Sequence, residues 1–127
     1  MAARTPEEGP RLWAENFIAG DLDNLVALYE EDAALVAQPG EVVTGTDAIR
    51  EALSGFLATQ PTFNLEVRKV LDTGDIALCF SDWTLAGTGP DGEPIELAGH
   101  TSDVMRRQPD GSWRFVIDNP WGSAHGF

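Results

Sequence analysis

The hydrophobic period of this chain changes at Pro61, and that change predicts the fold class. Before Pro61, four apolar residues follow the helical spacing i, i+3, i+4 and i+7, namely Leu22, Leu25, Val26 and Tyr29. After it, apolar and polar residues alternate from Phe63 to Arg68, which is the pattern of a strand with one buried face. Helices first and strands afterwards predict an α+β domain in which helices cover one face of a sheet.

Capping residues mark the starts of three helices. Thr5-Pro6 offers a hydroxyl cap followed by a proline in the first turn, and Gly20 ends this first helix. Asp21 is expected to cap the second helix, and Thr46 the third. We therefore expect three N-terminal helices, each with an apolar face turned toward the sheet.

Turn sequences rich in glycine, proline and aspartate separate the strands. The strands are expected at residues 33–37, 63–71, 76–86, 95–107 and 113–119. Val70-Leu71 interrupts the alternation and predicts a bulge, and Val42-Val43 is a candidate for one more short strand. The element order is then α-α-β-α-β-β-β-β. A single domain spanning residues 1–127, with a curved antiparallel sheet on three helices, predicts a cone with an apolar cavity at its wide end.

Acidic residues dominate the charge. Lysine and arginine total 8 and aspartate and glutamate 21, which gives a formal net charge of −13 at pH 7. Charge of this sign repels nucleic acids and anionic lipid surfaces, so we expect neither as a partner. The lone Cys79 cannot form an intrachain disulfide, and no apolar run approaches the ~20 residues of a membrane span. We therefore expect a cytoplasmic protein.

Motifs for metal or cofactor binding are not evident. The two histidines, His100 and His125, do not form a helical pair of ligands. Gly87-Thr88-Gly89 is followed by a proline and is typical of a turn rather than of a phosphate-binding loop. We therefore expect no metal and no cofactor, and a site built from carboxyl groups and aromatic rings.

Three groups of segments together resemble the ketosteroid isomerase-like and SnoaL-like family of the nuclear transport factor 2 superfamily. They are Ala19-Gly20-Asp21-Leu22 with residues 28–33, Val43-Thr44-Gly45 with residues 48–50, and Asp103-Val104-Met105-Arg106 with Asp110-Gly111. Their order and spacing cover most of the chain. The resemblance implies a cone-shaped domain that holds a small, largely apolar molecule.

The steroid isomerases of this family suggest roles for three positions. In those enzymes a tyrosine and a protonated aspartic acid donate hydrogen bonds to an enolate oxygen, and a second aspartate moves the proton. The resemblance places the protonated acid at Asp103, but it places Trp13 where the tyrosine stands and Gln38 where the second aspartate stands. Glutamine cannot abstract a proton at neutral pH, so we do not expect true steroid isomerisation.

The register of the last two strands decides which side chains meet. Around the turn at 109–111, the numbers of paired residues sum to between 219 and 221. A sum of 219, suggested by the resemblance, pairs Thr101 with Asp118 and makes Asp103 a diagonal neighbour on the same face. Two desolvated carboxyls this close would become a protonated acid, Asp103, and an ionised base, Asp118. A sum of 220 would instead bring His100 beside Asp118 as a histidine-aspartate pair.

Aromatic residues are expected around the mouth of the cone, where they would sandwich a flat ligand: Trp13, Tyr29, Trp83 and Trp121. Asn119 precedes a proline and is therefore extended, which would swing Asn119 and Trp121 over the cavity. Together with Gln38 and Thr101, these residues form the predicted binding site.

Two classes of function remain open. The first is an enzyme of isomerase, cyclase or hydrolase type that moves a proton or activates water on a small hydrophobic substrate through Asp103 and Asp118. The second is a non-catalytic ligand-binding or dimeric accessory domain with the same cavity. Because a broad sheet with apolar outer side chains must be covered, we also expect a homodimer through the outer face of the sheet.

Overall fold

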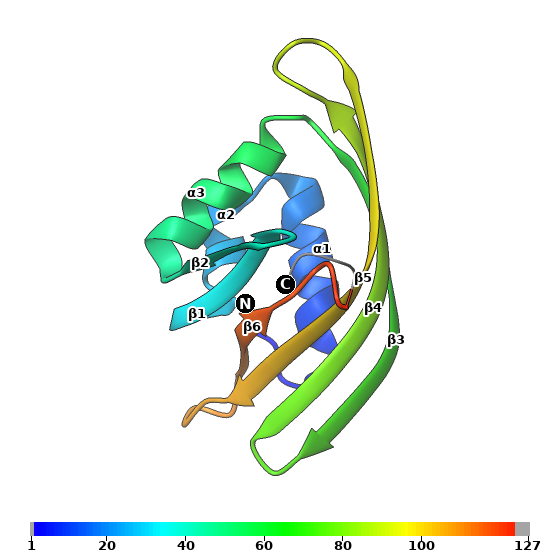
Figure 1. Ribbon diagram of the computed structural model, residues 1–127. Coiled ribbons are helices and arrows are strands. Elements are labelled where there is room, and N and C mark those ends of the chain that lie inside the picture. Colours follow the sequence, from blue (N-terminus) through cyan, green and yellow to red (C-terminus); the bar gives the residue numbers. More distant parts are fainter. Residues whose placement is uncertain (1, 124–127) are drawn as a thin grey trace.

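The structure is a computed structural model and describes residues 2–123. Within these residues three helices and six strands follow one another in the order α1 (Glu8–Ala19), α2 (Leu22–Val26), β1 (Tyr29–Gln38), β2 (Glu41–Thr44), α3 (Thr46–Leu57), β3 (Thr62–Thr73), β4 (Ile76–Thr88), β5 (Pro94–Arg107) and β6 (Trp113–Asp118). The strands form one curved sheet in the order β2-β1-β6-β5-β4-β3, and the helices lie on its concave side (Figure 1). The α+β class with helices packed on a curved sheet is confirmed.

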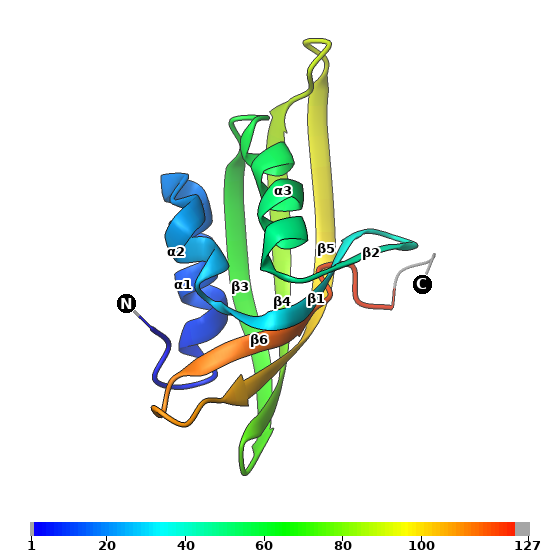
Figure 2. The ribbon, with the colours of Figure 1, turned by 90° about the vertical axis from the view of Figure 1, so that its left-hand side faces the viewer.

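The direction of β1 differs from the expected antiparallel sheet. β1 runs parallel to β6, with Leu35 paired to Asp118, whereas the other neighbouring strands are antiparallel. Figure 2 shows β1 and β6 side by side although they lie near opposite ends of the chain. Hairpins impose antiparallel pairing on consecutive strands, but no hairpin joins β1 to β6, so packing decides their relative direction.

Tyr29 belongs to β1 and not to the second helix. Asp21 caps α2 as expected, since its Oδ1 accepts a hydrogen bond from the Asn24 backbone N–H at 3.2 Å, but this helix ends at Val26. The Leu28 carbonyl then accepts from the Phe115 N–H at 2.8 Å, which starts the pairing with β6. A short apolar run fits both the helical and the extended pattern, and here pairing with a distant strand decides between them.

Several helix and strand boundaries also differ from those expected from the sequence. α1 begins at Glu8 rather than at Thr5, and Gly45, with φ 88°, takes the cap position of α3 that was expected for Thr46. The candidate strand at Val42-Val43 forms as part of β2. The bulge in β3 lies between Val67 and Lys69, ahead of the expected position at Val70-Leu71. Gly45 can take the cap position of α3 because glycine adopts a positive φ at little steric cost.

The core fills the space between the helices and the concave face of the sheet. α1 packs on β3, and α3 packs on β1, so the two helices leave the middle of the sheet, β4 to β6, facing a hollow between them. On β4 the buried residues alternate with outward ones, as the sequence pattern predicted, and Cys79, Ser81, Trp83 and Leu85 face inward. None of the helices in the described part of the chain is long and apolar enough to cross a membrane.

Gly99 on β5 leaves the room that Trp83 occupies. The two residues are cross-strand partners. A Cβ on Gly99 would lie 2.7 Å from the Pro120 carbonyl oxygen and 2.8 Å from the Trp83 ring. The glycine therefore lets the indole and the chain after β6 approach the strand closely.

We predict that Gly99→Ala destabilises the domain by about 1–3 kcal/mol, because the added methyl group forces the Trp83 ring or the Pro120 backbone to move. Gly55→Ala is the matched control, since Gly55 is an exposed residue of α3 and an added Cβ would have no atom within 4 Å. That change should leave the free energy of unfolding equal to that of the wild type or raise it by up to about 1 kcal/mol. Urea unfolding measures both, and equal stability of the two variants would contradict the close approach at Gly99.

Candidate active site

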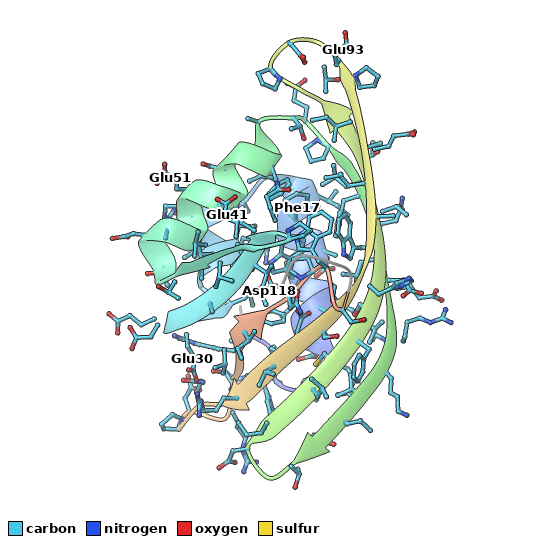
Figure 3. All side chains as sticks on the ribbon, in the orientation of Figure 1. Phe17, Glu30, Glu41, Glu51, Glu93 and Asp118 are labelled. Atoms are coloured by element: carbon cyan, nitrogen blue, oxygen red, sulfur yellow. The ribbon has the colours of Figure 1, made fainter. Side chains whose placement is uncertain are left out.

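A bulge in β6 brings Asp103 and Asp118 opposite each other. Near the turn the paired numbers of β5 and β6 sum to 220, but the register shifts between Met105 and Val104, and Val104 pairs with Ile117. Beyond this point the sum is 221, and the Ser102 N–H donates to the Asn119 carbonyl at 2.9 Å. The two carboxyls are therefore direct cross-strand neighbours, closer than the diagonal arrangement expected from a sum of 219. Figure 3 shows Asp118 in the space between the helices and the sheet.

His100 lies on the outer face of the sheet, so the expected pair of His100 with Asp118 is not formed. Its side chain is 87% exposed, and its Nδ1 lies 2.6 Å from Oδ1 of Asp82. The reason is the alternation of a strand, since Thr101 and Asp103 face the cavity and His100 therefore faces away. Assigning His100 to the site was wrong.

A chain of hydrogen bonds runs from α1 to the carboxyl pair. Trp13 Nε1 donates to the Tyr29 hydroxyl at 2.8 Å, and that hydroxyl donates to Oδ2 of Asp118. Asp118 and Asp103 share a hydrogen bond between their side chains. The backbone N–H of Asn119 donates to Oδ1 of Asp103 at 2.9 Å. Both carboxyls are buried, with residue exposures of 4% for Asp103 and 5% for Asp118.

The environment assigns the shared proton to Asp103. Burial raises the pKa of Asp103 well above its usual value, and the neighbouring Asp118 raises it further. Burial also raises the pKa of Asp118, but the hydrogen bonds that it accepts from Tyr29 and Asp103 oppose that rise. The pair therefore holds one proton and one negative charge, with the acid at Asp103 and the carboxylate at Asp118.

Tyr29 remains a neutral phenol at physiological pH. Burial raises its pKa well above the ordinary value, and the charge of Asp118 raises it further. Its role as a hydrogen-bond donor to Asp118 was not foreseen, because the sequence pattern assigned Tyr29 to a helix. To predict this role, one would have had to assign residues 29–38 to a strand. That strand depends on pairing with β6, which no local pattern reveals.

An apolar cavity of about 60 Å³ lies beside the carboxyl pair. Thr101, Asp103 and Asp118 contribute its polar atoms. Aliphatic and aromatic side chains form its walls, and the aromatic ones are Trp13, Phe17, Phe56, Phe63, Trp83, Phe115 and Trp121. The phenylalanines among them were not predicted as site residues, because buried phenylalanine at regular spacing is also what an ordinary core requires.

Three of the four predicted aromatic residues line the cavity, and hydrogen bonds or stacking fix their rings. Trp13 stacks on Phe17 with ring centroids 4.8 Å apart, and Trp83 Nε1 donates to the Pro120 carbonyl at 2.7 Å. Trp121 meets Trp83 edge to face at 5.2 Å. The fourth, Tyr29, lies behind Asp118 rather than at the cavity surface.

Of the three other residues predicted to contact a ligand, only one lines the cavity. Gln38 is exposed at the end of β1 and does not line the cavity, because Leu35 and Ala37 take the inward positions of that strand. Thr101 lines the cavity, and its Oγ1 accepts a hydrogen bond from the Ser81 N–H at 3.0 Å. The Asn119 side chain donates to the Gly122 carbonyl at 2.9 Å and shapes the turn after β6 instead of contacting the cavity.

Within residues 2–123 no group of three histidine, cysteine, aspartate or glutamate side chains is placed to hold a metal ion. His125 lies outside the described residues. A site without metal or cofactor stays a prediction from the sequence.

Comparison with known families identifies the domain. The model of the SnoaL-like domain matches residues 11–116. The chain belongs to the SnoaL-like domain family. This confirms the resemblance drawn from the sequence. A comparison with curated protein sequences gave no match.

Solved structures with the same fold support this assignment. A ketosteroid isomerase-like protein from Erwinia carotovora atroseptica superposes with a TM-score of 0.78 and 21% identity, covering 88% of each chain. A protein of the NTF2-like family from Streptomyces avermitilis gives 0.73 and 21%, covering 89% of this chain and 90% of its own. An NTF2-like protein from Novosphingobium aromaticivorans gives 0.70 and 21%, covering 87% and 75%. At this identity the likeness concerns the fold alone.

We predict that Asp103→Asn removes a pH-dependent part of the stability. Because the pKa of Asp103 is raised by folding, the folded protein keeps a proton that the unfolded chain releases above about pH 4. This contribution to the free energy of unfolding is complete below that pH and is lost as the pH rises through the folded-state pKa. Urea unfolding measured at successive pH values should show a larger decline in the wild type than in Asp103→Asn, in which only Asp118 still has a pKa raised by burial.

Asp82→Asn provides the control for this measurement, since Asp82 lies on the outer face of the sheet and pairs with His100. It should keep the decline caused by Asp103. If Asp103→Asn and the wild type lose stability in parallel as the pH rises, the proton is not held on Asp103.

Proposed function

We propose that this SnoaL-like domain is an acid–base enzyme that moves a proton within a small, uncharged and largely apolar carbonyl compound, as isomerases do. One observation carries the proposal: two buried carboxyls on neighbouring strands lie at the surface of an apolar cavity, and burial raises the pKa of both, most strongly that of Asp103. A protonated acid next to an ionised base is the arrangement that acid–base catalysis on a carbonyl compound requires.

In the proposed reaction the Asp103 O–H turns from Asp118 toward the cavity and donates a hydrogen bond to the carbonyl oxygen of the substrate. The Asp118 carboxylate takes a proton from the carbon next to the carbonyl, and the electron pair of that C–H bond forms a C=C bond while the carbonyl electrons move to oxygen. Asp103 stabilises the negative charge that develops on this oxygen. Asp118 then returns a proton to the substrate. Return to the same carbon results in hydrogen exchange with solvent, and return to a conjugated carbon gives an isomer.

The surroundings of the pair favour both steps. Aromatic and aliphatic walls exclude water, so the hydrogen bond to the developing oxyanion is stronger than it would be in solution. Burial raises the pKa of Asp118 and makes this carboxylate a better base, while the Tyr29 hydroxyl holds it in place. Among the described residues no cationic side chain lines the cavity, which favours an uncharged substrate over a carboxylate.

Ligand binding without catalysis is the second candidate, and the size of the cavity favours it. Its volume of about 60 Å³ is well below the ~300 Å³ or more of pockets for drug-sized ligands. In this form the cavity would shelter a small molecule, and the carboxyl pair would serve to orient a polar atom of that molecule.

Hydrogen exchange in butanone separates the two candidates, because this small ketone has α-protons that an enzymatic base removes. In D2O the wild type should accelerate deuterium incorporation, followed by proton NMR. We predict that Asp118→Asn lowers this rate by about 10²- to 10⁴-fold, since an amide cannot accept the proton. Asp82→Asn, with its carboxylate on the outer face, should retain the wild-type rate. Exchange that survives in Asp118→Asn would refute the proposed base, and binding without exchange would favour the second candidate.

We also propose that the domain forms a homodimer through the outer face of the sheet. Leu78, Phe80 and Val104 are half-buried there, and Ile117, the partner of Val104, is 43% exposed. A second copy that covers this apolar strip would remove it from water.

We predict a dimer by light scattering at micromolar concentration, and a shift toward the monomer in Ile117→Glu, because a charge would enter the covered strip. Ile18→Glu on α1 is the control, since Ile18 is exposed on a helix away from that face. A wild-type protein that remains monomeric would end this proposal.

A further inference from the structure

Hydrogen bonds join Trp13 to the carboxyl pair through Tyr29. Its indole belongs to α1, lines the cavity and stacks on Phe17 with an interplanar angle of 15°. That stacking fixes the plane of the ring, and with it the direction in which Nε1–H points. The N–H donates to the Tyr29 hydroxyl at 2.8 Å.

The Tyr29 hydroxyl has one proton and two neighbours. One is Trp13 Nε1–H, and the other is Oδ2 of Asp118. An indole N–H is only a donor, so the phenol cannot donate toward Trp13. Because the Tyr29 hydroxyl accepts the bond from Trp13, its own proton can form a hydrogen bond only with Asp118. The ring of Tyr29 is fully buried and packs on Phe115 at 5.5 Å, which prevents the hydroxyl from turning to water.

We propose that Trp13 is a positioning residue for the base: its indole N–H sets the direction of the Tyr29 hydroxyl, which in turn keeps Asp118 ionised and oriented toward the cavity. The inference rests on the proposed function for the role of Asp118 as the base. It assigns Trp13 a task other than contact with the ligand, although its ring also forms part of the cavity wall.

Two effects join Trp13 to the protonation of Asp118. A donor that binds the phenol oxygen polarises the O–H bond, and the phenol becomes a stronger donor to the carboxylate. The hydrogen bond from Tyr29 lowers the pKa of Asp118 and opposes the rise that burial causes. Among the described residues the titratable groups that act on Asp118 are Tyr29 from β1 and Asp103 from β5, and α1 adds the uncharged Trp13.

Trp13→Phe tests the inference, because it keeps an aromatic ring at the stacking position and removes the N–H. The pKa of Asp118 should rise, so the acid limb of the pH profile of butanone exchange should move to higher pH. The loss of one hydrogen bond corresponds to a rate about 2- to 10-fold lower on that limb, with a smaller difference at the alkaline end. The KM for butanone should change less than kcat, because the effect acts on the base rather than on binding.

Trp83→Phe is the matched control. Trp83 lines the same cavity and also loses an indole hydrogen bond, but its partner is the Pro120 carbonyl and not Tyr29. It should leave the position of the acid limb unchanged. Tyr29→Phe removes the direct donor to Asp118 and should move the limb further than Trp13→Phe does.

A second readout works without any turnover. The side-chain carboxyl carbon of Asp118, followed by ¹³C NMR, should titrate at higher pH in Trp13→Phe than in the wild type and in Trp83→Phe. If the titration moves but no variant exchanges butanone, the positioning role stands and the proposed enzyme function fails. If the Asp118 titration in Trp13→Phe coincides with that of the wild type, the inference is overturned.

Replacing Trp13 with benzothienylalanine covers the case in which Trp13→Phe does not fold. This residue keeps the shape of the bicyclic ring and carries sulfur in place of the N–H. The same displacement of the Asp118 titration is expected, and an unchanged titration would again overturn the inference.

Discussion

The burial of two carboxyl groups opposite each other is the constraint on which the site depends. Two negative charges in an apolar interior would repel each other and lose their hydration, so the pair keeps one proton. What remains is a single charge at Asp118, stabilised by the Tyr29 hydroxyl and by the shared proton of Asp103. The Asn119 N–H donates a hydrogen bond to Oδ1 of Asp103.

Four elements supply these groups. α1 presents Trp13, β1 presents Tyr29, β5 presents Asp103, and β6 presents Asp118 just after a bulge. The parallel pairing of β1 with β6 matters most, because it brings the Tyr29 hydroxyl to a carboxylate 89 residues further along the chain. The apolar cavity beside the pair then provides a low-dielectric space in which a donor or an acceptor acts strongly.

The same residue type behaves in opposite ways inside and outside the domain. Burial raises the pKa of Asp103, whereas Asp110, in an exposed turn, accepts two hydrogen bonds from Ser112 and has a lowered pKa. The strong net negative charge of the chain therefore says little about its site. Chemistry belongs to the few carboxyls that the fold removes from water.

The sequence by itself determined the class of fold and the family, because the switch of hydrophobic period and the family segments are local patterns. Only the tertiary structure decided which side chains meet. The bulge in β6 adds one residue within an ordinary strand pattern, and that single step pairs Asp118 with Asp103 instead of with Ser102, the neighbour of the outward-facing His100. Likewise, the local spacing of apolar residues could not place Tyr29, because its extended backbone depends on pairing with β6. Hydrophobic periodicity within a short segment does not predict contacts between distant segments.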